Sequence, residues 1–251
     1  MENQSWLKQP ALIAHRGDSK RAPENTLAAF RQAISLGVDF FEFDICLSKD
    51  GVPVCIHDST VMRTTDARGD YSVGDLTANA LKALDAGTWF DARFASEQIP
   101  LFDEVLQLDV GHVGMMIELK LEGGNIANLA AAALDRLHKR RPPTTCIIAS
   151  FSPEIIRAVI ALDPFQAVLG NVEDQHGLEA FLAMGLKHLC LWDKMVDASL
   201  MRQLILKEIC VWVFTVDQPK RAKALLEMGV MGIITNDPVG LQGSFKKNHA
   251  C

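Results

Sequence analysis

The chain has 251 residues, of which 49% are hydrophobic and 22% charged, a composition typical of a folded globular protein that excludes an intrinsically disordered one. The 25 basic residues against 31 acidic ones give a net charge of −6 at pH 7. An acidic chain without a basic run is poorly suited to nucleic acid or an anionic membrane, so we expect no nucleic-acid binding and no stable membrane association.

Short apolar or alternating runs typical of β-strands recur along the chain, and stretches with helical periodicity separate most of them. The first helical stretch, Thr26–Leu36, follows Asn25 as its predicted N-cap and ends at Gly37. The predicted strands are Ala11–His15, Phe40–Cys46, Val54–His57, Val113–Lys120, Cys146–Phe151, Ala167–Val172, His188–Asp193, Cys210–Val216 and Gly232–Asn236. The other predicted helices are Phe102–Leu108, Ile126–Arg140, Glu154–Leu162, Leu178–Met184, Ala198–Lys207 and Pro219–Met228.

A weak internal repeat supports this alternation of strand and helix. Leu36-Gly37-Val38, Met184-Gly185-Leu186 and Met228-Gly229-Val230 each end a predicted helix and lead into a strand. A glycine at this position permits the left-handed turn of a short connection. The pattern favours a parallel sheet with helical crossovers.

Nine predicted strands are one too many for a (β/α)8 barrel, and the third has a separate explanation. The segment from Leu47 to Gly51 is too short for a parallel crossover, and Asp50-Gly51 is a hairpin signal, which places His57 opposite Asp44. The other eight strands then form a single TIM-barrel domain over residues 1–251. The polar segment 59–101 is interpreted as an insertion between the second and third barrel strands, over the mouth. An open doubly wound sheet is the alternative fold.

The six cysteines form no CxxC pair, and the first five lie in predicted strands. We interpret them as buried reduced thiols, which favours a cytoplasmic protein over a disulfide-bonded or zinc-binding one.

Ionisable side chains gather where the early barrel strands end, which is where barrels of this type carry their sites. Glu42 and Asp44 lie two residues apart on one face of a strand, and Glu118 ends the next barrel strand. Carboxylates that converge in a cleft repel one another unless a cation is present. Oxygen ligands suit a hard ion, so the sequence predicts one divalent cation, Mg²⁺ or Ca²⁺.

Two histidines and two cations share this rim. His15 and His57 are candidates for general acid and base, because imidazole gains and loses a proton near neutral pH. Arg16 and Lys120 are candidates for binding phosphate oxygens. The alternative role of the two cations is to balance the charge of the carboxylates. Together the four residues and the metal predict phosphodiester cleavage.

Motifs along nearly the whole chain resemble those of the glycerophosphodiester phosphodiesterase family. Those with the most specific spacing are His15-Arg16-Gly17, Pro23-Glu24-Asn25-Thr26, Glu42-Phe43-Asp44 and His57-Asp58. The others are Lys49-Asp50-Gly51, Arg63-Thr64, Pro100-Leu101, Glu118-Leu119-Lys120, Ser150-Phe151 and Thr235-Asn236-Asp237-Pro238. Two departures, Ser48 for a frequent Thr and Asp217 for a frequent Asn, affect substrate preference more than the reaction.

The resemblance implies a TIM barrel with an insertion and metal-dependent hydrolysis of glycerophosphodiesters to sn-glycerol 3-phosphate and an alcohol. It implies that Glu42, Asp44 and Glu118 bind the metal, that His15 and His57 are the acid–base pair, and that Arg16 and Lys120 hold the phosphate. Glu24 and Asn25 would support these residues from behind. Trp212 and Phe214 would line the glycerol or alcohol pocket, with core packing as their alternative role.

The mechanistic hypothesis is attack on phosphorus by the neighbouring glycerol hydroxyl, with a cyclic phosphate that water then opens; direct attack by water is the competing route. A lipid-directed, phospholipase-like phosphodiesterase is the alternative enzyme, and a barrel that binds phosphodiesters without turnover is the alternative non-enzyme. The preferred alcohol, the identity of the cation, the assignment of acid and base, and a homo-oligomeric state stay open.

Overall fold

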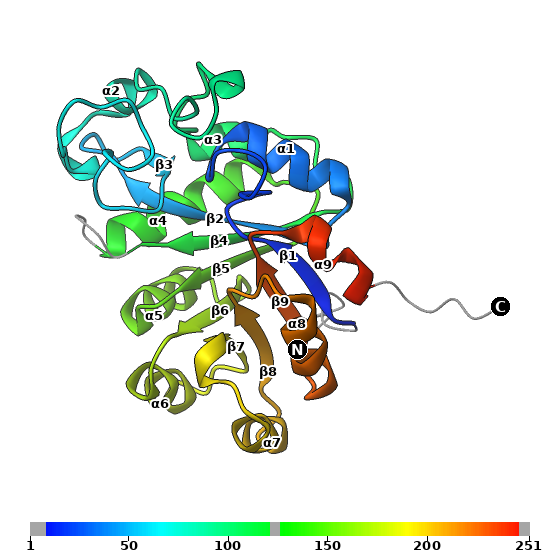
Figure 1. Ribbon diagram of the computed structural model, residues 1–251. Helices are drawn as coiled ribbons and strands as arrows, with labels where there is room; N and C mark the ends of the chain where they lie inside the picture. Colours follow the sequence, from blue (N-terminus) through cyan, green and yellow to red (C-terminus); the bar gives the residue numbers. More distant parts are fainter. Residues whose placement is uncertain (1–8, 121–125, 246–251) are drawn as a thin grey trace.

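The computed structural model describes residues 9–120 and 126–245, and within them eight parallel strands close into a barrel (Figure 1). Neighbouring strands pair in the order β1 (Ala11–Ala14), β9 (Gly232–Thr235), β8 (Cys210–Phe214), β7 (His188–Trp192), β6 (Ala167–Val172), β5 (Cys146–Ser150), β4 (Gly114–Leu119) and β2 (Phe40–Leu47). Pairing of β1 with β2 closes the ring. This closure confirms the (β/α)8 barrel and shows that the open doubly wound sheet was wrong.

Helices surround the strands as an outer layer. They are α1 (Leu27–Leu36), α3 (Phe102–Val105), α4 (Ile126–Arg140), α5 (Pro153–Leu162), α6 (Gln175–Ala183), α7 (Ala198–Leu206), α8 (Pro219–Glu227) and α9 (Pro238–Phe245), whereas α2 (Ala78–Lys82) lies apart, in the segment after β3 (Pro53–Cys55). A helix lies in each of the seven connections between consecutive barrel strands, and α9 follows the last strand, which is the arrangement that parallel pairing requires.

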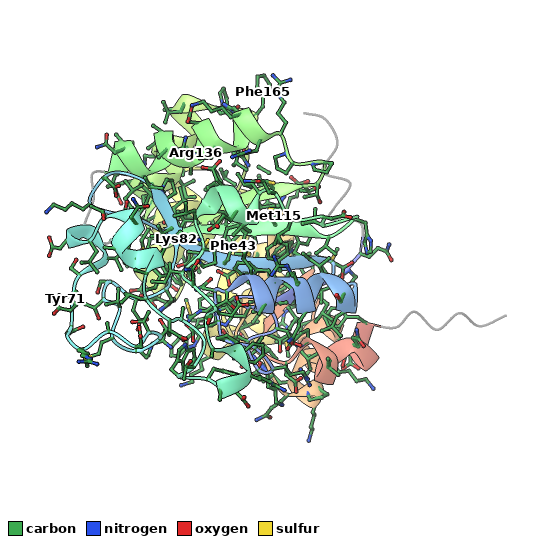
Figure 2. All side chains as sticks on the ribbon, turned by 90° about the horizontal axis from the view of Figure 1, so that it is seen from above. Phe43, Tyr71, Lys82, Met115, Arg136 and Phe165 are labelled. Atoms are coloured by element: carbon green, nitrogen blue, oxygen red, sulfur yellow. The ribbon has the colours of Figure 1, made fainter. Side chains whose placement is uncertain are left out.

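The strands bury both of their faces, in two separate apolar layers. On β2, Phe41 and Phe43 point outward into the large cluster beneath the helices, which also contains Met115 (Figure 2). Phe40 points inward and packs against Trp212 in the smaller cluster that fills the barrel interior. Since side chains alternate along a strand, Glu42 also points inward, above this apolar plug.

The first helix begins one residue later than the sequence predicted. Its N-cap is Thr26, whose Oγ1 accepts a hydrogen bond from Ala29 N, so the assignment of Asn25 as N-cap was wrong. Asn25 instead turns its amide toward Asp44 in the barrel mouth. At the other end, Gly37 has φ 65°, and the repeat glycines Gly185 and Gly229 also have positive φ, which confirms the predicted helix endings.

The hairpin from β2 to β3 (Pro53–Cys55) forms, with a register shifted by one residue. The structure pairs Ile45 with Cys55 and Cys46 with Val54, so the prediction that Asp44 lies opposite His57 was wrong. The turn has three residues rather than two, because Gly51 adopts φ 75° at its last position. His57 follows β3 and still lines the barrel mouth.

The segment that follows β3 has a small apolar cluster of its own. It contains α2 and two short 3-10 helices, Val73–Asp75 and Ala92–Phe94. Val61, Val73, Leu81 and Ile99 pack with Val54 of β3 in this cluster. Through this cluster the segment is anchored on the β2–β3 hairpin, beside the strands that carry the carboxylates.

The cysteines of the described residues are all free thiols. Cys46, Cys55 and Cys190 are buried, as expected, whereas Cys146 and Cys210 are only partly so. The sixth, Cys251, lies outside the described residues.

The Thr26 hydroxyl offers a test of this local structure. It is fully buried, donates to Pro23 O at 2.7 Å and caps α1. We expect Thr26→Ala to lower the free energy of unfolding by about 1–3 kcal/mol, because it removes the cap and leaves a buried carbonyl without its donor. Thr26→Ser keeps the hydroxyl and is expected to cost less than about 1 kcal/mol. Urea unfolding measures both, and equal losses would show that the methyl group, not the hydroxyl, matters.

Candidate active site

The site begins at a tight turn after β1. Arg16 has φ 55° and Gly17 has φ 81°, and this turn points Arg16 N at Glu42 Oε2, 2.9 Å away. A Cβ on Gly17 would lie 2.6 Å from the backbone of Ala29 in α1, so only glycine fits here. The turn therefore brings His15 and Arg16 to the carboxylates of β2.

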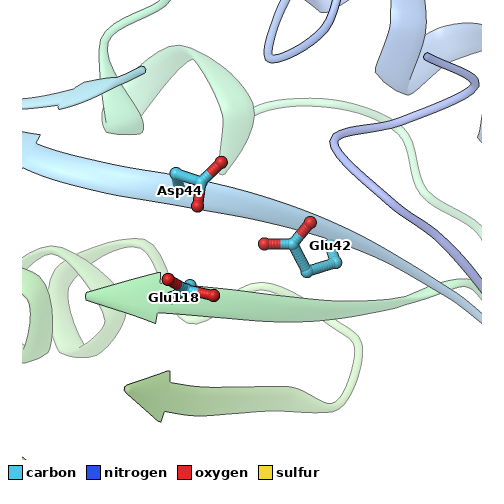
Figure 3. Close-up of side chains that lie close together, drawn as sticks. All are labelled: Glu42, Asp44 and Glu118. Atoms are coloured by element: carbon cyan, nitrogen blue, oxygen red, sulfur yellow. The ribbon is translucent and has the colours of Figure 1, made fainter. Parts of the chain in front are cut away.

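Three carboxylates converge at the carboxyl ends of β2 and β4, as the sequence predicted (Figure 3). Asp44 and Glu118 are register partners on the paired strands, and Glu42 lies two residues before Asp44 on the same face. All three are buried, and one oxygen of each lies within 4.8 Å of the others. Such close packing of like charges requires compensation.

Two cations supply part of this compensation. Lys120 Nζ lies 2.5 Å from Glu118 Oε1 and 3.1 Å from Asp44 Oδ1, and Arg16 Nε lies 3.4 Å from Asp44 Oδ2. Burial by itself would raise the pKa of Asp44, but Lys120 and Arg16 outweigh it and hold that pKa well below its usual value. Asp44 is therefore the stable negative charge of the site.

The other two carboxylates are less well compensated. Burial raises the pKa of Glu42 well above its usual value, and the charges of Asp44 and Glu118 add to the effect. Burial and Asp44 likewise raise the pKa of Glu118 to about 7. In the described part of the chain, Glu42 Oε1 is buried without a hydrogen-bond partner. This unmet acceptor, next to two further carboxylates, fits a hard divalent cation, and oxygen-only ligands favour Mg²⁺ or Ca²⁺.

His15 is held in one orientation by a chain of hydrogen bonds. Its Nδ1 lies 2.7 Å from Asn236 Oδ1, and Asn236 Nδ2 donates to Asp217 Oδ2 at 2.9 Å. Because Asp217 is an acceptor, it fixes the Asn236 amide with its oxygen toward His15, so Nδ1 carries the proton and Nε2 is free of it. Nε2 lies 3.9 Å from Glu42 Oε2. Burial, helped by Arg16, lowers the pKa of His15 to about 4.

His57 is held by a second chain that begins in the insertion. Its Nδ1 lies 2.6 Å from Asp58 Oδ1, and Arg63 clamps Asp58 and Glu24 together. The hydrogen bond from Arg63 is the main cause that lowers the pKa of Asp58 to about 2. Glu24 in turn accepts from Arg16 Nη1 at 2.7 Å. The network therefore runs without a break from His57 to Arg16.

A cavity of about 640 Å³ opens above these groups. His15, Arg16, His57, Glu118 and Lys120 line one part of it. The rest of the lining comes from other strand ends, the connections after them and the start of α5, and it includes Phe151, Glu154, Glu173 and Phe214.

The two aromatic residues of β8 that were predicted to line the glycerol or alcohol pocket have different surroundings. Phe214 lines the cavity, whereas Trp212 is 1% exposed and packs with Phe40 in the barrel interior, away from the cavity wall. The structure thus gives Trp212 its alternative role in the core. Glu24 and Asn25, in contrast, contact Arg16 and Asp44 from behind, where the sequence placed them.

Several polar residues of the site were not assigned from the sequence. Asn171 on β6 donates from Nδ2 to Glu118 Oε2 at 2.8 Å and is buried. Asn236, Asp217 and Arg63 orient the two histidines as described. The sequence signal for Asn171 was weak, since a lone polar residue inside a buried strand does not reveal its partner. Asn236 and Arg63 had a stronger signal, because both belong to the motifs that resemble those of the family.

The raised pKa of Glu118 predicts a pH-dependent stability in the presence of a chelator. Its pKa rises from an ordinary 4.5 to about 7 on folding, so between these pH values the folded chain binds more protons than the unfolded one. The contribution of Glu118 to the free energy of unfolding therefore falls as pH rises through this window, by about 3 kcal/mol. Urea unfolding of the wild type and of Glu118→Gln gives this contribution as the difference between their free energies of unfolding at each pH. A difference that stays constant or rises with pH would contradict the prediction.

None of the described helices combines the length and hydropathy that crossing a membrane requires.

Comparison with known proteins identifies the family of the chain. Residues 15–239 match the family model described as "Glycerophosphoryl diester phosphodiesterase family". The chain is similar to a glycerophosphodiester phosphodiesterase of Caldanaerobacter subterraneus subsp. tengcongensis, at 34% identity over 94% of this chain and 98% of the relative. A solved Oleispira antarctica phosphodiesterase, in complex with the product sn-glycerol-3-phosphate, superposes with a TM-score of 0.88 at 29% identity, covering 94% of this chain and 96% of that one. A glycerophosphodiester phosphodiesterase from Agrobacterium tumefaciens superposes with a TM-score of 0.76 at 26% identity, covering 93% and 99%. The chain belongs to the glycerophosphoryl diester phosphodiesterase family and is an enzyme of that class.

Proposed function

We propose that this enzyme hydrolyses soluble glycerophosphodiesters to sn-glycerol 3-phosphate and an alcohol, with a divalent cation and a pair of histidines. One observation carries the proposal: two imidazoles, two cations and Glu118 line a single cavity, and the buried carboxylates of Glu42 and Asp44 lie within 4.8 Å of Glu118. The product bound by the Oleispira antarctica relative, which this chain resembles over nearly its whole length, supports the same substrate class.

Glu42, Asp44 and Glu118 would hold the cation, Mg²⁺ or Ca²⁺. When bound, it supplies positive charge beside the phosphoryl oxygens and a reacting hydroxyl, and this stabilises the negative charge that develops there. Arg16 and Lys120 already lie against the same carboxylates. Their remaining N–H groups are available to a phosphodiester anion in the cavity, where donors in fixed positions stabilise the phosphorane-like charge.

The two histidines would divide the proton transfers between them. His15 is the base, because burial lowers its pKa to about 4 and Asn236 leaves its Nε2 without a proton. Its Nε2 takes the proton from the attacking hydroxyl as the new P–O bond forms. His57 is the acid: Asp58 accepts from its Nδ1 and stabilises an imidazolium, whose Nε2 proton goes to the departing alcohol oxygen. The roles reverse when water opens a cyclic phosphate.

Removal of either imidazole tests this assignment. His15→Ala and His57→Ala are each expected to lower kcat by about 10²–10⁴-fold, which is the usual contribution of a positioned acid or base. His112→Ala, an exposed histidine before β4, is the matched control and should keep wild-type kcat. The measurement is release of sn-glycerol 3-phosphate from soluble glycerophosphodiesters. Wild-type rates in both site variants, with the fold intact, would reject the histidine mechanism.

The cation site is tested without reference to activity. Mg²⁺ or Ca²⁺ should raise the Tm of the wild type, by an amount equivalent to about 2.7 kcal/mol at a hundred times the dissociation constant. Glu42→Gln should weaken this stabilisation, since it removes one charged ligand, whereas Glu227→Gln, on an exposed position of α8, should not. Equal shifts in wild type and Glu42→Gln would exclude Glu42 as a ligand. Assays with chelator and with each metal restored then link binding to turnover.

A further inference from the structure

The part of the cavity away from the carboxylates is built differently from the catalytic part. It is lined by Phe151, which follows β5, by Phe214 at the end of β8, and by Glu154 and Glu173 on the α5 side and after β6. Among the described residues that line the cavity, the basic side chains are Arg16 and Lys120. Each forms an ion pair with a carboxylate of the site or of its support. This second part is therefore aromatic and acidic.

The two phenylalanines form a corner. Their ring centroids lie 5.6 Å apart with planes at 83°, an edge-to-face arrangement in which one ring presents its edge to the other. Both side chains are partly exposed at the cavity. The face of an aromatic ring is electron-rich and attracts cations, most strongly those with little hydration such as quaternary ammonium groups. Lys120 Nζ lies over the Phe151 ring at 5.9 Å from its centroid, so this ring already faces one cation, whereas no cation of the described residues lies over the Phe214 ring.

Glu154 and Glu173 differ in whether other side chains of the protein already contact their carboxylates. Glu154 accepts from Arg157 Nη1 at 3.1 Å and from Ser152 Oγ at 3.0 Å. Glu173 is exposed and makes no hydrogen bond or ion pair with the residues that the structure describes. Its charge is therefore available to a ligand in the cavity.

The helix N-termini at this end both carry a side-chain cap. Ser152 caps α5 by accepting from Ile155 N, and Asp174 caps α6 by accepting from Gly177 N. Each cap engages an N–H that would otherwise attract an anion. The Asp174 cap also adds a second carboxylate next to Glu173.

We propose that this second part of the cavity binds a cationic alcohol group of the substrate, an amino alcohol whose ammonium lies two carbons from the phosphoester oxygen. The phosphate would lie against Arg16 and Lys120, and the short linker would carry the ammonium to the Phe151–Phe214 corner and Glu173. A neutral polyol gains neither a cation–π contact nor a charge attraction, and the carboxylate repels an anionic alcohol group. This inference rests on the proposed function and adds the substrate preference of the same site.

The test compares kcat/KM for three diesters that differ only in the alcohol: glycerophosphocholine, glycerophosphoethanolamine and glycerophosphoglycerol. The wild type should prefer the two cationic substrates over the neutral one by about tenfold, the size expected of a cation–π contact with one nearby charge. Glu173→Gln should reduce this ratio several-fold, and so should Phe214→Leu. Glu179→Gln removes the same charge from α6 outside the cavity lining and should leave the ratio unchanged.

Two results would overturn the proposal. The first is a wild type that cleaves all three substrates without preference, or prefers the neutral one. The second is a Glu173→Gln or Phe214→Leu variant that loses the same factor on every substrate, which would mean that these residues contact the shared glycerol phosphate. Failure of the wild type to cleave any of the three would reject the proposed function itself, and the head-group preference with it. High salt should weaken the Glu173 contribution more than that of Phe214, since screening acts on the exposed charge.

Discussion

The burial of three carboxylates in one barrel mouth is the constraint from which the rest of the site follows. Desolvation and mutual repulsion each disfavour the charged forms of Glu42 and Glu118, and the raised pKa values record that cost. Lys120 and Arg16 form ion pairs with Asp44 and stabilise its negative charge. Apolar side chains such as Phe40 and Trp212 fill the barrel interior below, so the carboxylates lie above them, on the rim.

The same rim is braced by two hydrogen-bonded chains that end on the histidines. One runs from Asp217 through Asn236 to His15, across the closing strands of the barrel. The other runs from Arg63 in the insertion through Asp58 to His57. Both chains place an acceptor opposite Nδ1, an amide oxygen for His15 and a carboxylate for His57, so the two imidazoles differ in the charge of the group that holds them. The insertion, which packs on β2 and β3, thereby contributes Arg63 to the network that holds His57.

The barrel and the carboxylate cluster were readable in the sequence because both depend on strand periodicity. Alternation placed Glu42 and Asp44 on one face, and the short Leu47–Gly51 connection identified the hairpin. The details that failed depend on choices that periodicity does not encode. Gly51 made the turn one residue longer, which shifted the register. Thr26 caps the helix instead of Asn25, because the amide of Asn25 forms hydrogen bonds with the buried Asp44, which is distant in sequence.

Trp212 and Phe214 show the limit of this reasoning most clearly. Both lie on the inward face of β8, so the sequence could not separate them, yet a two-residue step along a strand is about 6.6 Å and moves a side chain from one layer to the next. At the depth of Trp212 the barrel is closed on all sides and the ring serves packing. At the depth of Phe214 the ladder is ending, and the ring meets Phe151 over open space. The candidate site therefore lies in the last layer of the barrel, where side chains such as Phe214 are released from core packing.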